Sequence, residues 1–141
     1  MGIALSNDMK QLVDRPNFAH VATLMSDGSP HSAPVWIRRE GELLLVCTEA
    51  GSLKGKNTLR DPRVSISMVE FVDPYSEVQI RGRVVERRPD RELRQYDTMS
   101  RKYIGKPWPY RDEKSPIVLI IEVTKARYSK QPFGHTPPVT A

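Results

Sequence analysis

Cysteine is nearly absent from this chain of 141 residues, since Cys47 is the only one. A single cysteine excludes an intramolecular disulfide framework and a cysteine-based zinc site, and it favours a reduced, cytoplasmic setting. We interpret Cys47, at the end of an apolar run, as a buried small residue rather than a nucleophile. The three histidines, His20, His31 and His135, share no spacing with one another or with paired carboxylates. We therefore expect no metal site.

Long apolar runs are also missing. No window approaches the roughly 20 residues that cross a bilayer, and the N-terminus lacks the basic and apolar regions of a signal peptide. We therefore expect no membrane partner. The net charge of +5 suits an anionic partner. However, no RNP-like aromatic pattern or recognition helix is present, so we expect no nucleic-acid partner.

Catalytic fingerprints are absent as well. Neither G-x-x-x-x-G-K-[ST] nor G-x-G-x-x-G marks a nucleotide loop at the glycine-containing segment discussed below. No Ser/His/Asp arrangement stands out, and the glutamates Glu49, Glu70 and Glu77 form no obvious acid–base pair. An enzyme built on this sequence would have to take its chemistry from a cofactor.

What the sequence does contain predicts a mainly β single domain, residues 1–141. Alternating or continuous apolar runs bounded by turn residues predict six strands, at residues 18–25, 31–38, 43–48, 64–71, 76–87 and 117–123. Because hairpins rather than βαβ units join them, the sheet should be antiparallel. Closure into a small barrel would remove its edges.

Helical patterns are few. A short helix can start at Ser6 or Asn7. Pro89 should begin the only substantial helix, which runs to about Tyr103 and is closed by Gly105. The last residues, 129–141, form a polar, proline-rich tail that is either frayed or laid on a partner.

The segment 46–68 resembles an anion site: a strand, a Gly/Ser/Lys loop, a short helix and another strand. Ser52 can cap the helix, and Lys54 and Asn57 lie three residues apart, on one helical face. Lys56 adds a second ammonium group. Free N–H groups at a helix start together with ammonium groups favour a phosphate. A solvated basic loop is the alternative interpretation.

Arginines near this segment also have two interpretations. Arg60, one turn beyond, can reach the same anion or pair with Asp61. A second group lies on and after the long strand, and there a solvated strand face is favoured over a nucleic-acid surface; its members are Arg81, Arg83, Arg87 and Arg88.

Aromatic and proline residues suggest a second constellation. Pro34 lies within a predicted strand, where its missing N–H leaves backbone groups free to face a planar heterocycle. Trp36 can wall such a ring or be an ordinary core residue. Trp108 and Tyr110, flanked by prolines, can form an aromatic lid, a dimer contact or a local core.

Two sequence blocks carry a resemblance to a known superfamily. They are A-T-L-x-x-D-G-x-P at residues 22–30 and K-x-K-N-x-x-R-D-P at residues 54–62. Both resemble the pyridoxamine-5'-phosphate-oxidase-like, flavin-binding split β-barrel proteins, and V-Q-I-R-G-R-V, Y-I-G-K-P and I-V-L-I-I-E-V agree with them. Within this superfamily the chain is most similar to short actinobacterial enzymes that use the deazaflavin F420, the B type of the flavin/deazaflavin oxidoreductase group.

The resemblance implies a six-stranded antiparallel split β-barrel that forms a homodimer, with the cofactor groove at the interface. It also implies hydride transfer from reduced F420 to a small conjugated or unsaturated substrate. The alternatives are an FMN-dependent oxidoreductase of the same fold and a non-catalytic flavin- or deazaflavin-binding protein.

Site residues follow from the same resemblance, by position. The phosphate would be held by Ser52, Lys54, Lys56 and Asn57, although the family's Asn-Leu is here interrupted by Thr58. Backbone contacts to the ring would come from Ser32, Ala33, Pro34, Val35 and Trp36. Thr48 would line the ribityl chain and Gln79 would approach the cofactor. Trp108 and Tyr110 of the partner chain would wall the substrate.

Overall fold

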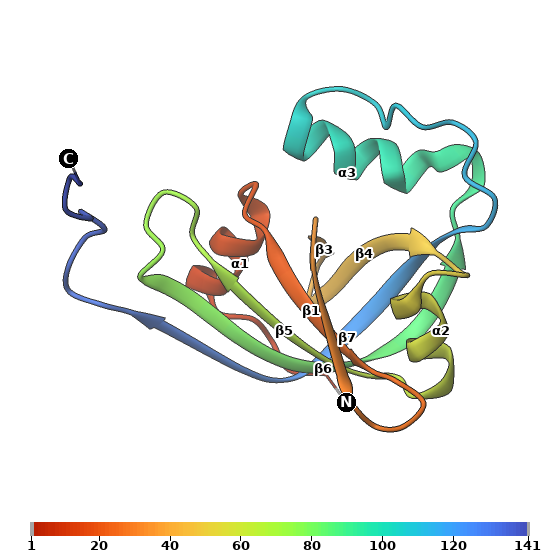
Figure 1. Ribbon diagram of the computed structural model, residues 1–141, viewed down its shortest axis with the longest axis horizontal. Coiled ribbons are helices and arrows are strands. Elements are labelled where there is room, and N and C mark those ends of the chain that lie inside the picture. Colours follow the sequence, from red (N-terminus) through yellow and green to blue (C-terminus); the bar gives the residue numbers. More distant parts are fainter. Residues whose placement is uncertain (1, 141) are drawn as a thin grey trace.

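The computed structural model describes residues 2–140 and shows a mainly β molecule (Figure 1). Its strands are β1 (Ala19–Leu24), β2 (Pro30–Val35), β3 (Arg38–Glu40), β4 (Leu43–Glu49), β5 (Arg63–Val69), β6 (Ser76–Pro89) and β7 (Pro116–Lys130). Its helices are α1 (Asn7–Asp14), α2 (Leu53–Arg60) and α3 (Arg94–Ile104), with a short 3-10 turn, η1 (Arg91–Leu93).

The strands form one antiparallel sheet in the order β2-β1-β5-β6-β7-β4-β3. The sheet curls strongly (Figure 1), yet its two edge strands, β2 and β3, do not pair with each other within residues 2–140, so the barrel is split rather than closed. The predicted mainly β, antiparallel split barrel is confirmed.

Seven strands form instead of the predicted six, because the returning strand expected at residues 31–38 breaks at Trp36 and Ile37. Its first half, β2, pairs with β1, whereas its second half, β3, pairs with β4. Pro34 lies on the edge strand β2, the position at which a residue without an N–H group costs the sheet least.

The core fills the inside of the curved sheet. Along β6, Val78, Ile80 and Val84 are buried while Gln79 and Arg81 are exposed, as the predicted alternation requires. The apolar face of α1 joins the same core, and Ser6 caps that helix by accepting a hydrogen bond from its first turn. These contacts give the site a rigid support.

Gly82 lets β6 cross β7 closely. A Cβ atom at this position would lie 2.4 Å from the backbone oxygen of Glu122. The pairing register shifts beside it, between Arg81 and Gly82 and again between Val84 and Glu86. Only a residue without a side chain allows the two backbones to lie this close.

The start predicted for α3 is wrong. Pro89 is the last residue of β6, and the helix begins only at Arg94, after η1. The buried carboxylate of Asp90 explains the later start, because its two oxygens accept hydrogen bonds of 2.8 and 2.9 Å from N–H groups of the first helical turn. Gly105, with φ 73°, ends the helix as expected.

The C-terminal end of α3 is tied to the barrel. Lys102 Nζ donates hydrogen bonds of 2.5 Å to the backbone oxygens of Val13 and Ile37. Tyr103 Oη donates to the Asn17 oxygen at 2.5 Å and accepts from the Ile37 N–H at 3.1 Å. Burial lowers the pKa of Lys102 to about 8 and raises that of Tyr103 to about 12.

β7 is longer than predicted and continues through Lys130, so irregular chain begins at residue 131 rather than 129. The Phe133 ring packs edge-on against Tyr75, with centroids 4.7 Å apart. This contact places the start of the tail beside the β5–β6 turn. The final tail residue, Ala141, lies outside the described residues.

Candidate functional site

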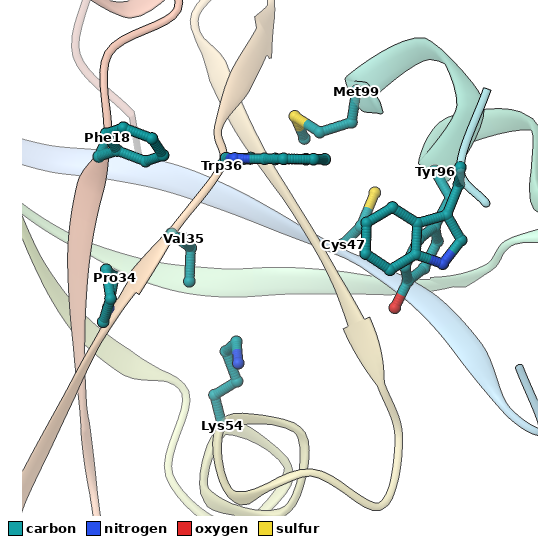
Figure 2. Close-up of a pocket in the computed structure, with 9 residues that line it drawn as sticks. Phe18, Pro34, Val35, Trp36, Cys47, Lys54, Tyr96 and Met99 are labelled. Atoms are coloured by element: carbon teal, nitrogen blue, oxygen red, sulfur yellow. The ribbon is translucent and has the colours of Figure 1, made fainter. Parts of the chain in front are cut away.

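A cavity of about 360 Å³ lies beneath α3, between β2, β4 and the start of α2 (Figure 2). Its volume is at the lower end of the range for small-molecule sites, so it suits one planar ring system rather than an entire large cofactor. The lining residues are Phe18, Pro34, Val35, Trp36, Cys47, Lys54, Tyr96, Met99 and Trp108.

Trp36 and Trp108 form a fixed aromatic corner of this cavity. The Trp36 ring stacks on the Tyr103 ring, with centroids 5.1 Å apart and 5° between the ring planes. The Trp108 ring packs edge-on against the Trp36 ring, with centroids 5.7 Å apart. The Trp108 Nε1 group donates to Glu113 at 3.0 Å, and its backbone N–H donates to Asp97 at 3.0 Å. Both indoles are therefore held where they can contact a planar ligand.

Lys54 is the charged group of the cavity. Its side chain extends from α2 toward the aromatic residues (Figure 2) and is partly buried. Within residues 2–140 it has neither a hydrogen-bond partner nor an ion-pair partner, and burial lowers its pKa. An ammonium group held in apolar surroundings without a partner is unfavourable. This arrangement is typical of a site that binds an anion or a strong acceptor.

The start of α2 is organised by Ser52. Its hydroxyl accepts from the Gly55 N–H at 3.0 Å and donates to the Glu49 oxygen at 2.8 Å. Its remaining contact, with Thr48 Oγ1 at 2.7 Å, must then be donated by Thr48. Both hydroxyls are thus engaged within the protein. The first-turn N–H groups of Leu53 and Lys54 have no acceptor inside the helix and stay available to an anion.

The remaining predicted phosphate residues do not gather around Lys54. The amide of Asn57 is buried, donates to Thr23 at 3.0 Å and accepts from Arg60 at 3.0 Å. Asn57 therefore anchors α2 to β1, and its amide is not free to hold a phosphate. Lys56 is exposed and, two residues from Lys54, projects from a different side of the helix.

Of the two interpretations of Arg60, the ion pair with Asp61 does not form in the structure. Its guanidinium donates to the Leu24 backbone oxygen at 2.6 Å and braces α2 against β1. Asp61 instead pairs with Arg63 at 2.7 Å, and that guanidinium lowers the pKa of Asp61 to about 2. Arg60 and Asp61 thus each bind a neighbour other than one another.

On β2, the predicted ring-binding residues divide into two groups. Pro34 and Val35, with Trp36 just beyond the strand, line the cavity. Ser32 is exposed, and neither it nor Ala33 lines the cavity. Because β2 is an edge strand, one row of its backbone groups is free of sheet hydrogen bonds and can meet a ligand.

Gln79 lies elsewhere. It is on the outer face of the sheet, in a separate hollow of about 700 Å³ whose lining includes Ser67, Arg81 and Arg127. No residue lines both this hollow and the aromatic cavity. A cofactor bound in the cavity of the same chain would not be in contact with Gln79.

Trp108 lines the cavity of its own chain, whereas the resemblance implies that it walls the site of the partner chain. Tyr110 is 62% exposed and lies outside the cavity, with its ring 5.3 Å from the Trp108 ring. Trp108 is therefore part of the local aromatic packing, and Tyr110 only flanks it.

Four lining residues were missed: Phe18, Cys47, Tyr96 and Met99. Tyr96 and Met99 lie three residues apart on α3, a spacing that predicts a buried helical face but does not show that this face covers a cavity. Burial raises the pKa of the Cys47 thiol to about 12, so the thiol stays protonated, as expected for a non-nucleophilic residue.

Glu49 and Glu113 lie together beside the aromatic corner. Burial raises the pKa of Glu49, but the hydrogen bonds with Glu113 and from the Lys114 and Ser115 N–H groups together outweigh it and leave the pKa lowered. The pKa of Glu113 is raised, first by its hydrogen bond to Glu49 and then by burial. Glu113 is therefore the weaker acid of the pair.

Two general features of residues 2–140 bear on function. No helix in this range combines the length and the apolar character needed to span a bilayer. The same range contains no cluster of three or more side chains able to hold a metal ion.

Solved structures share this architecture. A structure described as an F420 reductase is 25% identical, covers 87% of this chain and 98% of its own, and has a TM-score of 0.81. A conserved hypothetical protein from Mycobacterium tuberculosis is 21% identical, with coverages of 99% and 96% and a TM-score of 0.73. The General Stress Protein 26 from Bacillus anthracis is 17% identical, with coverages of 86% and 91% and a TM-score of 0.66.

Among curated proteins, none matches this chain. The pyridoxamine 5'-phosphate oxidase family matches residues 5–130, which include the whole sheet and every residue that lines the cavity. This match and the architecture shared with the F420 reductase support a flavin- or deazaflavin-related oxidoreductase. The chain belongs to the pyridoxamine 5'-phosphate oxidase family.

Proposed function

We propose that this protein is an F420-dependent oxidoreductase that reduces a small conjugated or unsaturated substrate. The observation that carries the proposal is Lys54, whose ammonium group has no partner among residues 2–140 and enters an aromatic cavity from the start of α2. The 25% identity to a structure described as an F420 reductase favours F420 over FMN.

The residues present fit such a cofactor. Pro34, Val35 and Trp36 offer an apolar surface and an edge strand's free backbone groups to a tricyclic ring. Lys54 and the free N–H groups of the first α2 turn offer positive charge to an anionic group. When bound, the cofactor supplies the hydride, so the protein's own part is to bind, orient and exclude water.

The cavity is large enough for only one part of the cofactor. About 360 Å³ accommodates a ring system but not the phosphodiester and glutamate tail of F420. These anionic parts would lie on the surface near α2, where Lys56 is exposed. The net charge of +5 favours their approach.

A homodimer is part of the proposal. Gln79 was expected near the cofactor but lies on the outer face of the sheet, in a hollow separate from the cavity. It could contact a cofactor only if a second subunit brought its own cavity to this face. Light scattering of the purified protein tests the dimer directly, because a monomeric mass would remove this role for Gln79.

Turnover tests the proposed reaction. Purified protein mixed with reduced F420 and a conjugated ketone such as 2-cyclohexen-1-one should oxidise the cofactor at a rate proportional to enzyme concentration. Binding of F420 without turnover on enones, quinones or tetrapyrroles would instead indicate a non-catalytic deazaflavin-binding protein. Turnover with reduced FMN alone would indicate the FMN-dependent alternative.

A further inference from the structure

Tyr96 contributes the only hydroxyl group among the residues that line the cavity. In Figure 2 its oxygen points away from α3, toward the side of the cavity from which Lys54 enters. Within residues 2–140 this hydroxyl has no hydrogen-bond partner, and it is not among the fully buried polar atoms that lack one. It is therefore a free donor that opens into the cavity.

The hydroxyl of Tyr103, by contrast, is hydrogen-bonded within the protein. The two tyrosines lie on the same helix, but the Tyr103 hydroxyl donates to Asn17 and accepts from Ile37, and so serves to fasten α3. Trp108 Nε1, another polar atom of the lining, is likewise engaged, by Glu113. The cavity thus leaves the Tyr96 hydroxyl available to a ligand.

The position of Tyr96 is well defined. Its backbone N–H donates to the buried Asp90 carboxylate at 2.9 Å, and its ring packs against Trp108 with centroids 5.5 Å apart. Burial, followed by the nearby charge of Glu113, raises the pKa of its phenol. Tyr96 therefore remains protonated and able to donate at neutral pH.

We propose that Tyr96 is a catalytic residue that donates a hydrogen bond to the carbonyl oxygen of a planar, conjugated ketone or quinone substrate. This inference rests on the proposed function, which it deepens by naming the residue that contacts the carbonyl oxygen of the substrate. The aromatic corner of Trp36 and Trp108 favours a flat substrate.

The chemical role follows from where charge develops. Hydride addition to the carbon β to the carbonyl moves the C=C electron pair toward the α carbon and the carbonyl electron pair onto oxygen. The Tyr96 O–H stabilises this oxygen without giving up its proton. Water then protonates the α carbon, the C=O bond is restored, and the product is the saturated ketone. The reduced cofactor supplies the hydride and releases one proton to water.

Binding to the protein without cofactor tests this assignment independently of turnover. Menadione, a flat quinone, should quench the emission of Trp36 and Trp108. Tyr96→Phe removes only the hydroxyl and should weaken menadione binding about fivefold, as expected for one hydrogen bond. The control Tyr75→Phe removes a hydroxyl that lies beyond the cavity and contacts His135, its sole partner among the described residues, and should bind like the wild type. Equal menadione affinity in Tyr96→Phe and the wild type would overturn the proposal.

Kinetics provide the second readout. Tyr96→Phe should lower kcat for 2-cyclohexen-1-one about 100-fold, as loss of one donor to a developing oxyanion does. Reduction of a tetrazolium dye, which has no carbonyl, should change less than twofold. An equal loss with both acceptors would mean that Tyr96 only supports the cavity. If the wild type does not oxidise reduced F420 at all, the proposed function fails, and the menadione comparison still decides the role of Tyr96.

Discussion

Replacing Lys54 by methionine separates ligand binding from folding at one position. Methionine keeps most of the length of the side chain and removes its charge. In the free protein the Lys54 ammonium has no partner among residues 2–140 and burial lowers its pKa, so the substitution breaks no internal contact of that group. The free energy of unfolding should stay within about 0.5 kcal/mol of the wild-type value or rise.

Cofactor binding should respond very differently. A hydrogen bond between a charged donor and its acceptor contributes about 1.5–3 kcal/mol, so its loss should weaken F420 binding roughly 10- to 100-fold. Lys56→Met is the matched control, since Lys56 lies on the same helix but is exposed and outside the cavity. Its effect should stay below about fivefold, because exposed charges are screened by solvent and salt.

The assay is a titration with F420 that follows quenching of Trp36 and Trp108, with thermal unfolding of each cofactor-free variant in parallel. Repeating the titration at low and high salt separates the two lysines. The contribution of Lys56 should fade with salt, whereas that of the partly buried Lys54 should largely remain. Unchanged F420 affinity in Lys54→Met, or an equal loss in both variants, would refute the assignment of Lys54 to the cavity's anion site.

Three further predictions concern the scaffold. Ser52→Ala removes the α2 cap and should lower the free energy of unfolding by about 0.5–2 kcal/mol in denaturant titration; an unchanged midpoint would contradict the capping role. Gly82→Ala places a Cβ 2.4 Å from a backbone oxygen of β7 and should cost about 1–3 kcal/mol or prevent folding; wild-type stability would contradict the close approach. The hydrogen bond to Glu49 raises the pKa of Glu113 in the folded protein. The stabilisation from Glu113 is therefore complete below the pKa that this group has in the unfolded chain, and it is lost as the pH rises through the folded-state pKa. Emission from Trp108, bonded to Glu113, should titrate in that window in the wild type and not in Glu113→Gln.

The fold could be predicted from the sequence because its signals are local. The alternation of apolar and polar residues along β6, the proline on β2 and the helix cap at Ser52 each predict a local backbone structure, and the structure has all three. The prediction failed at Pro89, because a proline suits the end of a strand as well as the first turn of a helix. The later start of α3 depends on the Asp90 carboxylate, a contact that no periodicity reveals.

The site was only partly predictable, because its residues meet through tertiary structure. The sequence predicts that Lys54 binds an anion and that Trp36 contacts a planar ring, and both residues line the cavity. The three-residue spacing of Lys54 and Asn57 predicts that both side chains lie on one face of the helix. The packing of α2 on β1 nevertheless buries the Asn57 amide. Tyr96 enters the site only because α3 stands over the open end of the barrel, an arrangement set by the ties of Lys102 and Tyr103.

The most direct test of the central claim is the ratio of two dissociation constants, for F420 and for FMN, measured on the same cofactor-free protein by tryptophan quenching. We predict micromolar affinity for F420 and affinity at least tenfold weaker for FMN. Tighter binding of FMN, or protein that is yellow with FMN as purified, would contradict a deazaflavin enzyme and support the FMN-dependent alternative.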